Sequence, residues 1–314
     1  MALRVAFFGT PRFAVPALEH LVRSPHQVVG VITQPDRPRG RGQHVSEAPV
    51  KALAVSLGLP VLQPERLAEG RFAVAFAALQ ADIGVVAAYG KILPDWLLAT
   101  PRRGLINVHA SLLPRYRGAS PVHRAVIAGD DHTGVTIMRV VTALDAGPML
   151  SRVRVPIGPD DTTMAVEARL AVEGAALLIA ALDDLDAGRA TETPQDESQA
   201  TYAPKLTKAE GQVDWRRPAR QVHNLVRGLW PWPHAYGFLE GTRVILHRSR
   251  LSSITAPSPP GTILAASATD GLHVACGEGA IEIVDLQLEG KRAMVARDQM
   301  ASRLFTVGAR WSSP

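Results

Sequence analysis

The sequence predicts an α/β protein in which a doubly wound, mostly parallel sheet is followed by a small β-barrel. In the first half of the chain, short apolar runs alternate with segments of helical periodicity, as expected of a parallel sheet with helices on both faces. From about residue 221, short strands separated by glycines and prolines replace this pattern, which favours a small barrel. The length of 314 residues also exceeds what one core usually supports, so two domains are expected.

The first strand is expected at Arg4–Phe8, an apolar run that ends at Gly9, and the first helix at Pro11–Ser24, where apolar residues share one face. The same reasoning predicts further strands at Val28–Thr33, Ile83–Ala87, Leu105–His109 and Gly134–Met138, and helices at Val50–Leu57, Phe72–Leu79 and Val172–Leu185. Because such sheets bind ligands at the carboxyl ends of their strands, residues that follow the strands are candidates for a site.

A polar stretch without periodicity, GRATETPQDESQATYAPKLTKAEG, separates the two patterns. We therefore expect a first domain at 1–188, a linker at 189–208 and a second domain at 209–314. The strands expected in the second domain are Thr242–Leu246, Gly261–Leu264, Leu272–Ala275 and Ile281–Leu286. The five-stranded barrel that binds oligonucleotides (OB-like) is one architecture of this kind.

Composition predicts an ordinary globular protein of the cytoplasm. Hydrophobic residues make up 46% of the chain and charged residues 20%, a balance unlike that of disordered chains. The single cysteine, Cys276, cannot close an internal disulfide, and no apolar run has the length of a signal peptide or a membrane span. We expect a cytoplasmic monomer with no membrane partner.

The charge is uneven along the chain. Residues 1–204 contain 20 basic and 20 acidic residues, whereas residues 205–314 contain 14 and 9, so the net charge of +5 lies in the carboxy-terminal third. Such asymmetry indicates either a polyanionic partner such as nucleic acid or a solvated basic surface.

Several common cofactor motifs are missing from the sequence. The turn FFGTPRF has the first glycine of a dinucleotide-binding loop but lacks the second and third. No glycine-rich loop ends in Gly-Lys-Ser or Gly-Lys-Thr, and the ten histidines lack the spacing of metal ligands. We therefore expect neither a nicotinamide cofactor, nor phosphoryl transfer through such a loop, nor a metal site.

Three polar residues are candidates for catalysis. Asn107 and His109 alternate with Val108 at the end of an expected strand, so their side chains share one face. Asp145 lies in the loop after the strand at Gly134–Met138, where a carboxylate can reach them. Taken singly, each residue has an ordinary explanation as a turn or strand-end residue.

Together these motifs resemble the folate-dependent formyltransferase family. Asn-x-His at 107–109 precedes SLLPRYRG, and Gly134 is followed by Asp145 and Gly147 at the family's spacing. The similarity extends over nearly the whole chain, through FFGTPRFAVPAL, TQPDRPRGRG, VVAAYGKILP, GVTIMRV, TYAPKLTKAEGQVDW and LWPWPHAY. The resemblance implies a formyltransferase-type, Rossmann-like first domain, and the TQPDRP loop together with the second domain is typical of members that act on charged initiator tRNA.

The resemblance implies transfer of the formyl group of 10-formyltetrahydrofolate to the α-amine of methionine on initiator tRNA, without a metal. As the amine attacks, negative charge builds on the formyl oxygen, where Asn107 and a protonated His109 can each donate a hydrogen bond worth about 3 kcal/mol. Asp145 can pair with His109 and can accept the proton of the amine, directly or through water.

The resemblance also assigns binding residues. Those expected to border the folate are Val86, Tyr89, Gly90, Ile92, Ser111, Leu112, Leu113, Pro114 and Gly147. Those expected to contact the tRNA are Arg37, Arg39, Arg41, Lys205, Lys208, Arg216, Lys291 and Arg292. Arg41 occupies the position expected to sense the first pair of the acceptor stem. Gln43 and His44 stand where relatives commonly carry lysines, which weakens the phosphate contacts of this loop.

Three alternatives remain open from the residues alone: transfer to the amine of a sugar nucleotide, release of formate by water in the same site, and a non-catalytic RNA-binding protein. The loop with three arginines argues against the sugar nucleotide. The intact set of Asn107, His109 and Asp145 argues against a protein without catalytic activity.

Overall fold

The computed structural model describes residues 2–39, 44–68, 70–254, 256–300 and 302–312. Its internal contacts divide the chain into two compact units. Unit 1 comprises Met1–Pro121, Thr133–Val155 and Glu167–Ala203, and unit 2 comprises Val122–His132, Pro156–Val166 and Pro204–Pro314. Part of the segment expected to be a linker, up to Ala203, therefore belongs to unit 1.

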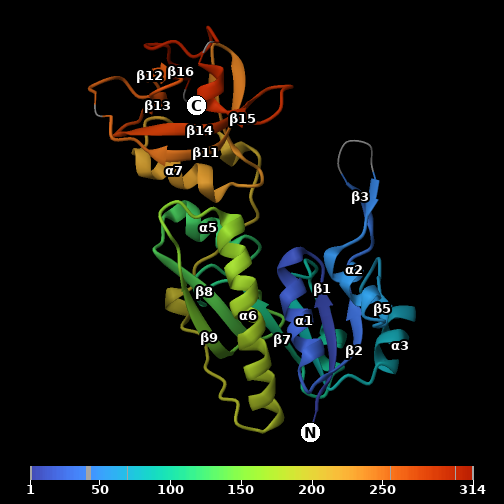
Figure 1. Cartoon of the computed structure of the whole chain (residues 1–314). Coiled ribbons are helices and arrows are strands. Elements are labelled where there is room, and N and C mark those ends of the chain that lie inside the picture. Colours follow the sequence, from blue (N-terminus) through green and yellow to red (C-terminus); the bar gives the residue numbers. More distant parts are fainter. Residues whose placement is uncertain (1, 40–43, 69, 255, 301, 313–314) are drawn as a thin grey trace. The chain divides into compact units, whose positions relative to one another are not determined.

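Unit 1 is built on a seven-stranded sheet in the order β5-β2-β1-β6-β7-β8-β9 (Figure 1). The strands are β1 (Arg4–Gly9), β2 (Gln27–Ile32), β5 (Val61–Leu62), β6 (Ile83–Ala87), β7 (Leu105–His109), β8 (His132–Arg139) and β9 (Met149–Pro156). The pairings β5-β2, β2-β1, β1-β6 and β6-β7 are parallel, and β8 runs antiparallel to β7. This sheet confirms the predicted doubly wound, mostly parallel architecture.

Helices cover both faces of the sheet. They are η1 (Arg12–Ala14), α1 (Val15–Arg23), α2 (Pro49–Ser56), α3 (Arg71–Ala78), α4 (Asp95–Ala99) and most of α6 (Thr163–Asp186). Helix α5 (Pro121–Ala128) belongs to unit 2 from Val122 on. Phe8 of β1 packs in one core cluster with Phe76 of α3 and Leu97 of α4. On the opposite face, a Cβ added to Gly174 of α6 would lie 3.0 Å from the Val108 side chain, so this helix packs closely on β7.

Unit 2 contains α7 (Ala219–Gly228) and a second sheet in the order β12-β13-β14-β11-β10-β16, with β15 paired to β14. The strands are β10 (Ala235–Leu239), β11 (Thr242–Leu251), β12 (Ile263–Ser267), β13 (Gly271–Ala275), β14 (Ala280–Leu288), β15 (Met294–Val295) and β16 (Trp311–Ser312). All of these pairings are antiparallel. Short 3-10 helices, η2 (Glu197–Gln199), η3 (Ala209–Gly211) and η4 (Ala296–Gln299), complete the chain.

The second sheet curls and joins its own edges. The Ile263 amide donates to the Ala309 carbonyl and the Trp311 amide donates to the Gly261 carbonyl, both at 2.9 Å, next to the edge strands β12 and β16. The predicted small barrel is thereby confirmed, with seven strands where five were considered. The two-residue strands β15 and β16 are too short to leave a periodic pattern in the sequence.

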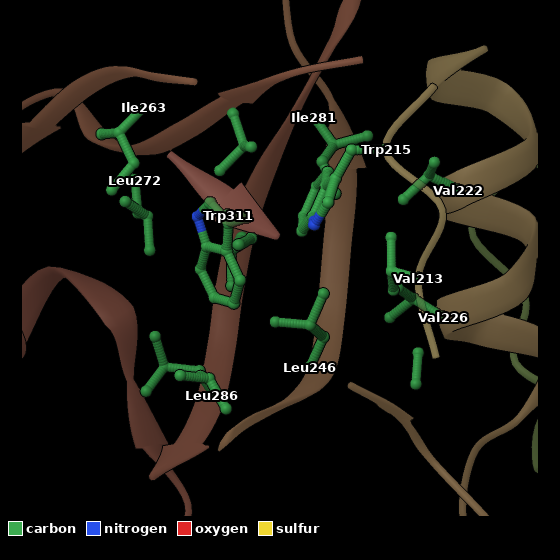
Figure 2. Packing of buried hydrophobic residues seen from close by; sticks show 14 of the residues in the cluster. Val213, Trp215, Val222, Val226, Leu246, Ile263, Leu272, Ile281, Leu286 and Trp311 are labelled. Carbon is green, nitrogen blue, oxygen red and sulfur yellow. The ribbon is translucent and has the colours of Figure 1, made fainter. Parts of the chain in front are cut away.

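The barrel core contains two tryptophans whose rings pack at a tilt of 49°, and Figure 2 shows them among the surrounding aliphatic side chains. The ring centroids of Trp215 and Trp311 lie 5.3 Å apart, and both side chains are buried. Val222 and Val226 of α7 belong to the same core cluster. The helix therefore packs against the barrel through its apolar face, which explains why α7 forms although several polar residues occur in its sequence.

Candidate functional site

The candidate site is organised around the imidazole of His109, which is 5% exposed at the end of β7. Its Nε2 atom lies 3.0 Å from the carbonyl oxygen of Tyr116. Because a carbonyl oxygen only accepts hydrogen bonds, Nε2 carries the hydrogen of this contact. The other ring nitrogen, Nδ1, lies 3.7 Å from Oδ2 of Asp145. Nδ1 is therefore the nitrogen that is left to act on a bound molecule.

Both residues that flank this imidazole have unusual backbones. Tyr116 has φ +63° and Asp145 has φ +48°, in the left-handed region that few residues other than glycine adopt. The Asp145 carboxylate also accepts a 2.8 Å hydrogen bond from the Gly118 amide through Oδ2. Non-glycine residues held in this region often mark functional sites, because the surrounding contacts must compensate for the strain.

Asn107 precedes His109 by two residues on β7, so the two side chains project from the same face of the strand. Its side chain is half-buried, and among the described residues none forms a hydrogen bond with its amide group. Val86 of β6 is the register partner of Asn107, and it is also half-buried. The amide is therefore available to a ligand beside an apolar side chain.

The loop that follows β7 is fixed by Thr136 of β8. The Thr136 hydroxyl donates to the Ser111 carbonyl at 2.7 Å and accepts from the Leu113 amide at 3.1 Å. Ser111, Leu113 and Pro114 are buried, whereas Leu112 is half-buried. A Cβ added to Gly134 would lie 2.4 Å from Leu112 and 2.1 Å from the Val153 carbonyl oxygen, so only glycine fits there.

The remaining predicted folate residues have different surroundings. Tyr89 is 1% exposed and packs edge-to-face on Phe8, at a centroid distance of 5.6 Å. Ile92 is 90% exposed. Gly90 has φ +79°, and a Cβ on Gly147 would lie only 1.9 Å from the Arg139 carbonyl oxygen. Backbone geometry thus explains both glycines without a ligand.

A hollow of about 440 Å³ lies beside β5 and α3 and is lined in part by Gln63, Arg71 and Phe72. It contains none of the residues predicted to border the folate. The candidate site therefore depends on the convergence of His109, Asp145 and Asn107 rather than on this hollow.

The predicted tRNA residues fall in both units. Arg37 and Arg39 belong to β3 (Arg37–Arg39), which forms a hairpin with β4 (His44–Ser46) in the register Arg39↔His44. Arg41 and Gln43 lie outside the described residues.

The other predicted basic residues, Lys205, Lys208, Arg216, Lys291 and Arg292, are all exposed and belong to unit 2. Arg216 donates to both carboxylate oxygens of Asp214, at 2.7 and 3.1 Å. This pairing raises the pKa of Arg216 and lowers that of Asp214. Part of the charge of Arg216 is thus already neutralised within the protein.

Three residues that contact the Asp145 loop or support it are not among the residues predicted from the sequence. The Gln195 amide donates to the Asp145 carbonyl, and its oxygen accepts from Arg117, which also binds Glu197. Gln195 and Glu197 lie in the polar segment that separates the two sequence patterns. Such contacts join residues that are far apart along the chain, and sequence periodicity indicates only local structure, so no signal in the sequence predicted them.

No group of three or more histidine, cysteine, aspartate or glutamate side chains in the described part of the chain is arranged to hold a metal ion. No helix in that part is long and apolar enough to cross a membrane.

Comparisons with known proteins identify the family of the chain. Residues 3–182 match the family described as "Formyl transferase", and residues 205–304 match "Formyl transferase, C-terminal domain". A methionyl-tRNA formyltransferase of Methylococcus capsulatus is 48% identical over 296 residues, which cover 94% of this chain and 96% of the relative. Another, of Methylobacillus flagellatus, is 46% identical over 312 residues, which cover 99% of this chain and 100% of the relative.

Solved structures share the fold at low sequence identity. A HypX variant of Aquifex aeolicus has a TM-score of 0.68 at 15% identity over 98% of this chain, which spans 50% of HypX. An N-formyltransferase of Helicobacter canadensis, solved with folinic acid and dTDP-3-aminofucose, has a TM-score of 0.68 at 15% identity. This match covers 90% of our chain and 98% of that protein.

Proposed function

The chain belongs to the formyl transferase family, and we propose that it transfers the formyl group of 10-formyltetrahydrofolate to the α-amine of methionine on initiator tRNA, for translation initiation. The observation that carries the proposal is the approach of the Asp145 carboxylate to Nδ1 of the buried His109, at 3.7 Å, on the strand that also carries Asn107. Relatives that are 46–48% identical over nearly their whole length bear the name of this activity.

Each of the three side chains has a distinct task in this proposal. The Asn107 amide donates to the formyl oxygen, where negative charge develops during attack. Protonated His109 donates to the same oxygen through Nδ1, because Nε2 is engaged by the Tyr116 carbonyl. Asp145 stabilises the protonated ring and accepts the proton that leaves the amine. Neither a covalent intermediate nor a metal is needed.

The residues around Asn107 fit a folate donor. The folate supplies the activated formyl group, and the protein must offer a hydrogen-bond donor beside an apolar surface. Asn107 has an amide without a described protein partner, and its neighbour Val86 is half-buried and apolar. We infer that the folate lies against Val86, Leu112 and the loop Ser111–Pro114, with the other predicted residues at its border. A relative of the same fold was solved with folinic acid, which supports this assignment.

We further propose that residues 1–188 carry the chemistry and that residues 209–314 bind tRNA through exposed basic side chains, with residues 189–208 between them. The basic segment TQPDRPRGRG, which contains Arg37, Arg39 and Arg41, would contact the acceptor stem. Charged tRNA is a cytoplasmic substrate, so we expect the protein to act there, as a monomer. Since phosphate neutralisation releases counterions, affinity for tRNA should fall steeply with salt.

The proposed function is tested by measuring formyl transfer to four acceptors: charged initiator tRNA, charged elongator tRNA, an amino sugar nucleotide and water. Rapid transfer to initiator tRNA alone supports the proposal, and a preference for the sugar amine or for formate release overturns it. The loop is tested with Arg41→Leu, which should depress formylation of initiator tRNA far more than hydrolysis of the folate donor. Equal effects on both reactions would contradict the role of Arg41.

A further inference from the structure

The loop that carries Asp145 is held by a side chain from a segment fifty residues later. The Gln195 amide nitrogen donates two hydrogen bonds, one to the Asp145 carbonyl and one to the Gly147 carbonyl, both at 2.8 Å. A primary amide has two hydrogens, so both are used to hold this loop. Gln195 thus spans the two residues on either side of Ala146.

The orientation of this amide is fixed from its other end by Arg117. The Gln195 oxygen accepts from Nε of Arg117 at 3.0 Å and from Nη2 at 2.8 Å. The guanidinium also binds both carboxylate oxygens of Glu197, at 2.9 and 2.7 Å, and its side chain is 2% exposed. Because a guanidinium only donates, it holds the oxygen of Gln195 toward itself and turns the NH₂ group toward Asp145.

Two separate contacts therefore define where the Asp145 carboxylate lies. Gln195 holds the backbone of the loop, and the Gly118 amide donates to Oδ2 at 2.8 Å. The φ of +48° at Asp145 is one that an unsupported loop seldom keeps. If Gln195 released the loop, the distance from Oδ2 to Nδ1 of His109 would no longer be set.

We propose that Gln195 is a positioning residue for formyl transfer: it holds the Asp145 loop so that the carboxylate faces Nδ1 of His109. The proposal rests on the proposed function, because it assigns Gln195 to the same site. It gives the polar segment before the barrel a task within unit 1, since both Gln195 and Arg117 belong to that unit.

The test uses Gln195→Glu in the full chain. Glutamate keeps an acceptor for Arg117 but has no hydrogens to offer the two carbonyls. We expect kcat for formylation of charged initiator tRNA to fall roughly 10- to 100-fold, because small displacements of catalytic groups cost this much. The KM values of the two substrates should change less than about twofold, since Gln195 does not touch them. Gln199→Glu is the matched control: Gln199 is exposed, bonds only Asp196 among the described residues, and should leave kcat unchanged.

A double-mutant cycle with Asp145→Asn separates positioning from a general structural effect. If Gln195 acts through Asp145, adding Gln195→Glu to Asp145→Asn lowers kcat little further. If the two residues act independently, the fold-losses of the two single variants multiply in the double variant. Each of three results would overturn the proposal: losses of kcat that multiply in the double variant, an unchanged kcat in Gln195→Glu, or an equal loss of kcat in Gln199→Glu. If Gln195→Glu does not fold, Gln195→Met is measured in the same way with the same outcomes. An inactive wild-type chain would instead overturn the proposed function, which is therefore measured first.

Discussion

Replacing Asp145 by asparagine removes the charge that faces His109 while preserving the shape of the loop. Asparagine has the same size, tolerates φ +48°, and can still accept the hydrogen bond from the Gly118 amide. The fold should therefore remain intact. What is lost is the interaction of the carboxylate with the protonated ring and the acceptor for the proton of the amine.

The size of the loss follows from the geometry. Two unit charges 3.7 Å apart interact by about 4.5 kcal/mol at an effective dielectric constant of about 20. The Asp145 side chain is only 16% exposed, so solvent screens part of this energy but not most of it. Loss of a general acid–base group typically slows a reaction by about 10²- to 10⁴-fold, which corresponds to about 2.7–5.4 kcal/mol. We expect kcat of Asp145→Asn to fall by a factor within this range.

The assay is the initial rate of formyl transfer to charged initiator tRNA at saturating folate donor, with thermal unfolding as a check on the fold. Asp183→Asn is the matched control, because Asp183 is another carboxylate beside a buried histidine, with its Oδ1 3.2 Å from Nε2 of His26. This control should keep its turnover. A rate for Asp145→Asn within a few-fold of the wild type, with the fold intact, would refute the role of the carboxylate.

Three further predictions concern stability. Trp311→Ala should lower the free energy of unfolding by about 3–5 kcal/mol in denaturant titrations, and a loss below about 1 kcal/mol would contradict the packing of the barrel core. Gly147→Ala should cost about 1–3 kcal/mol in the same titrations, because its Cβ would overlap the Arg139 carbonyl, and wild-type stability would be inconsistent with that close approach. The hydrogen bonds from Arg117 lower the pKa of Glu197 below its ordinary value of 4.5. The ionised Glu197 therefore stabilises the folded protein fully above that pH, and this stabilisation is lost as the pH falls below it. In Glu197→Gln, the free energy of unfolding should therefore decrease less steeply with falling acid pH than in the wild type. An unchanged decrease would count against the ion pair between Glu197 and Arg117.

Much of the first sheet could be predicted because its strands carry continuous apolar runs. The runs at Ile83–Ala87 and Leu105–His109 are found as β6 and β7 with the same bounds. The antiparallel direction of β8 could not be predicted from the sequence. Strand direction depends on how the chain returns to the sheet and not on the local pattern of residues. Helix α7 was not predicted, since His223, Asn224 and Arg227 are buried in it although they are polar.

These buried polar residues of α7 are satisfied by partners that a sequence does not show. Arg227 donates to the Gly158 and Asp161 carbonyls at 3.1 and 2.9 Å, and His223 Nε2 donates to the Pro159 carbonyl at 3.0 Å. Burial also lowers the pKa of His223, which favours its neutral form. A polar residue is stable in the interior only with such hydrogen bonds, and the hydrophobic pattern of a sequence does not predict which partners will form them.

That Asn107 and His109 share one face at the end of a strand was predictable from the amino-acid order alone, because side chains alternate with a period of two. It also determined the family, through motifs spread over nearly the whole chain. The folded chain was needed to show that Asp145 lies 3.7 Å from His109 and that Gln195, in a segment predicted to be a linker, holds the loop. Hydrogen bonds between residues fifty positions apart depend on how whole elements pack, and local periodicity carries no information about that packing.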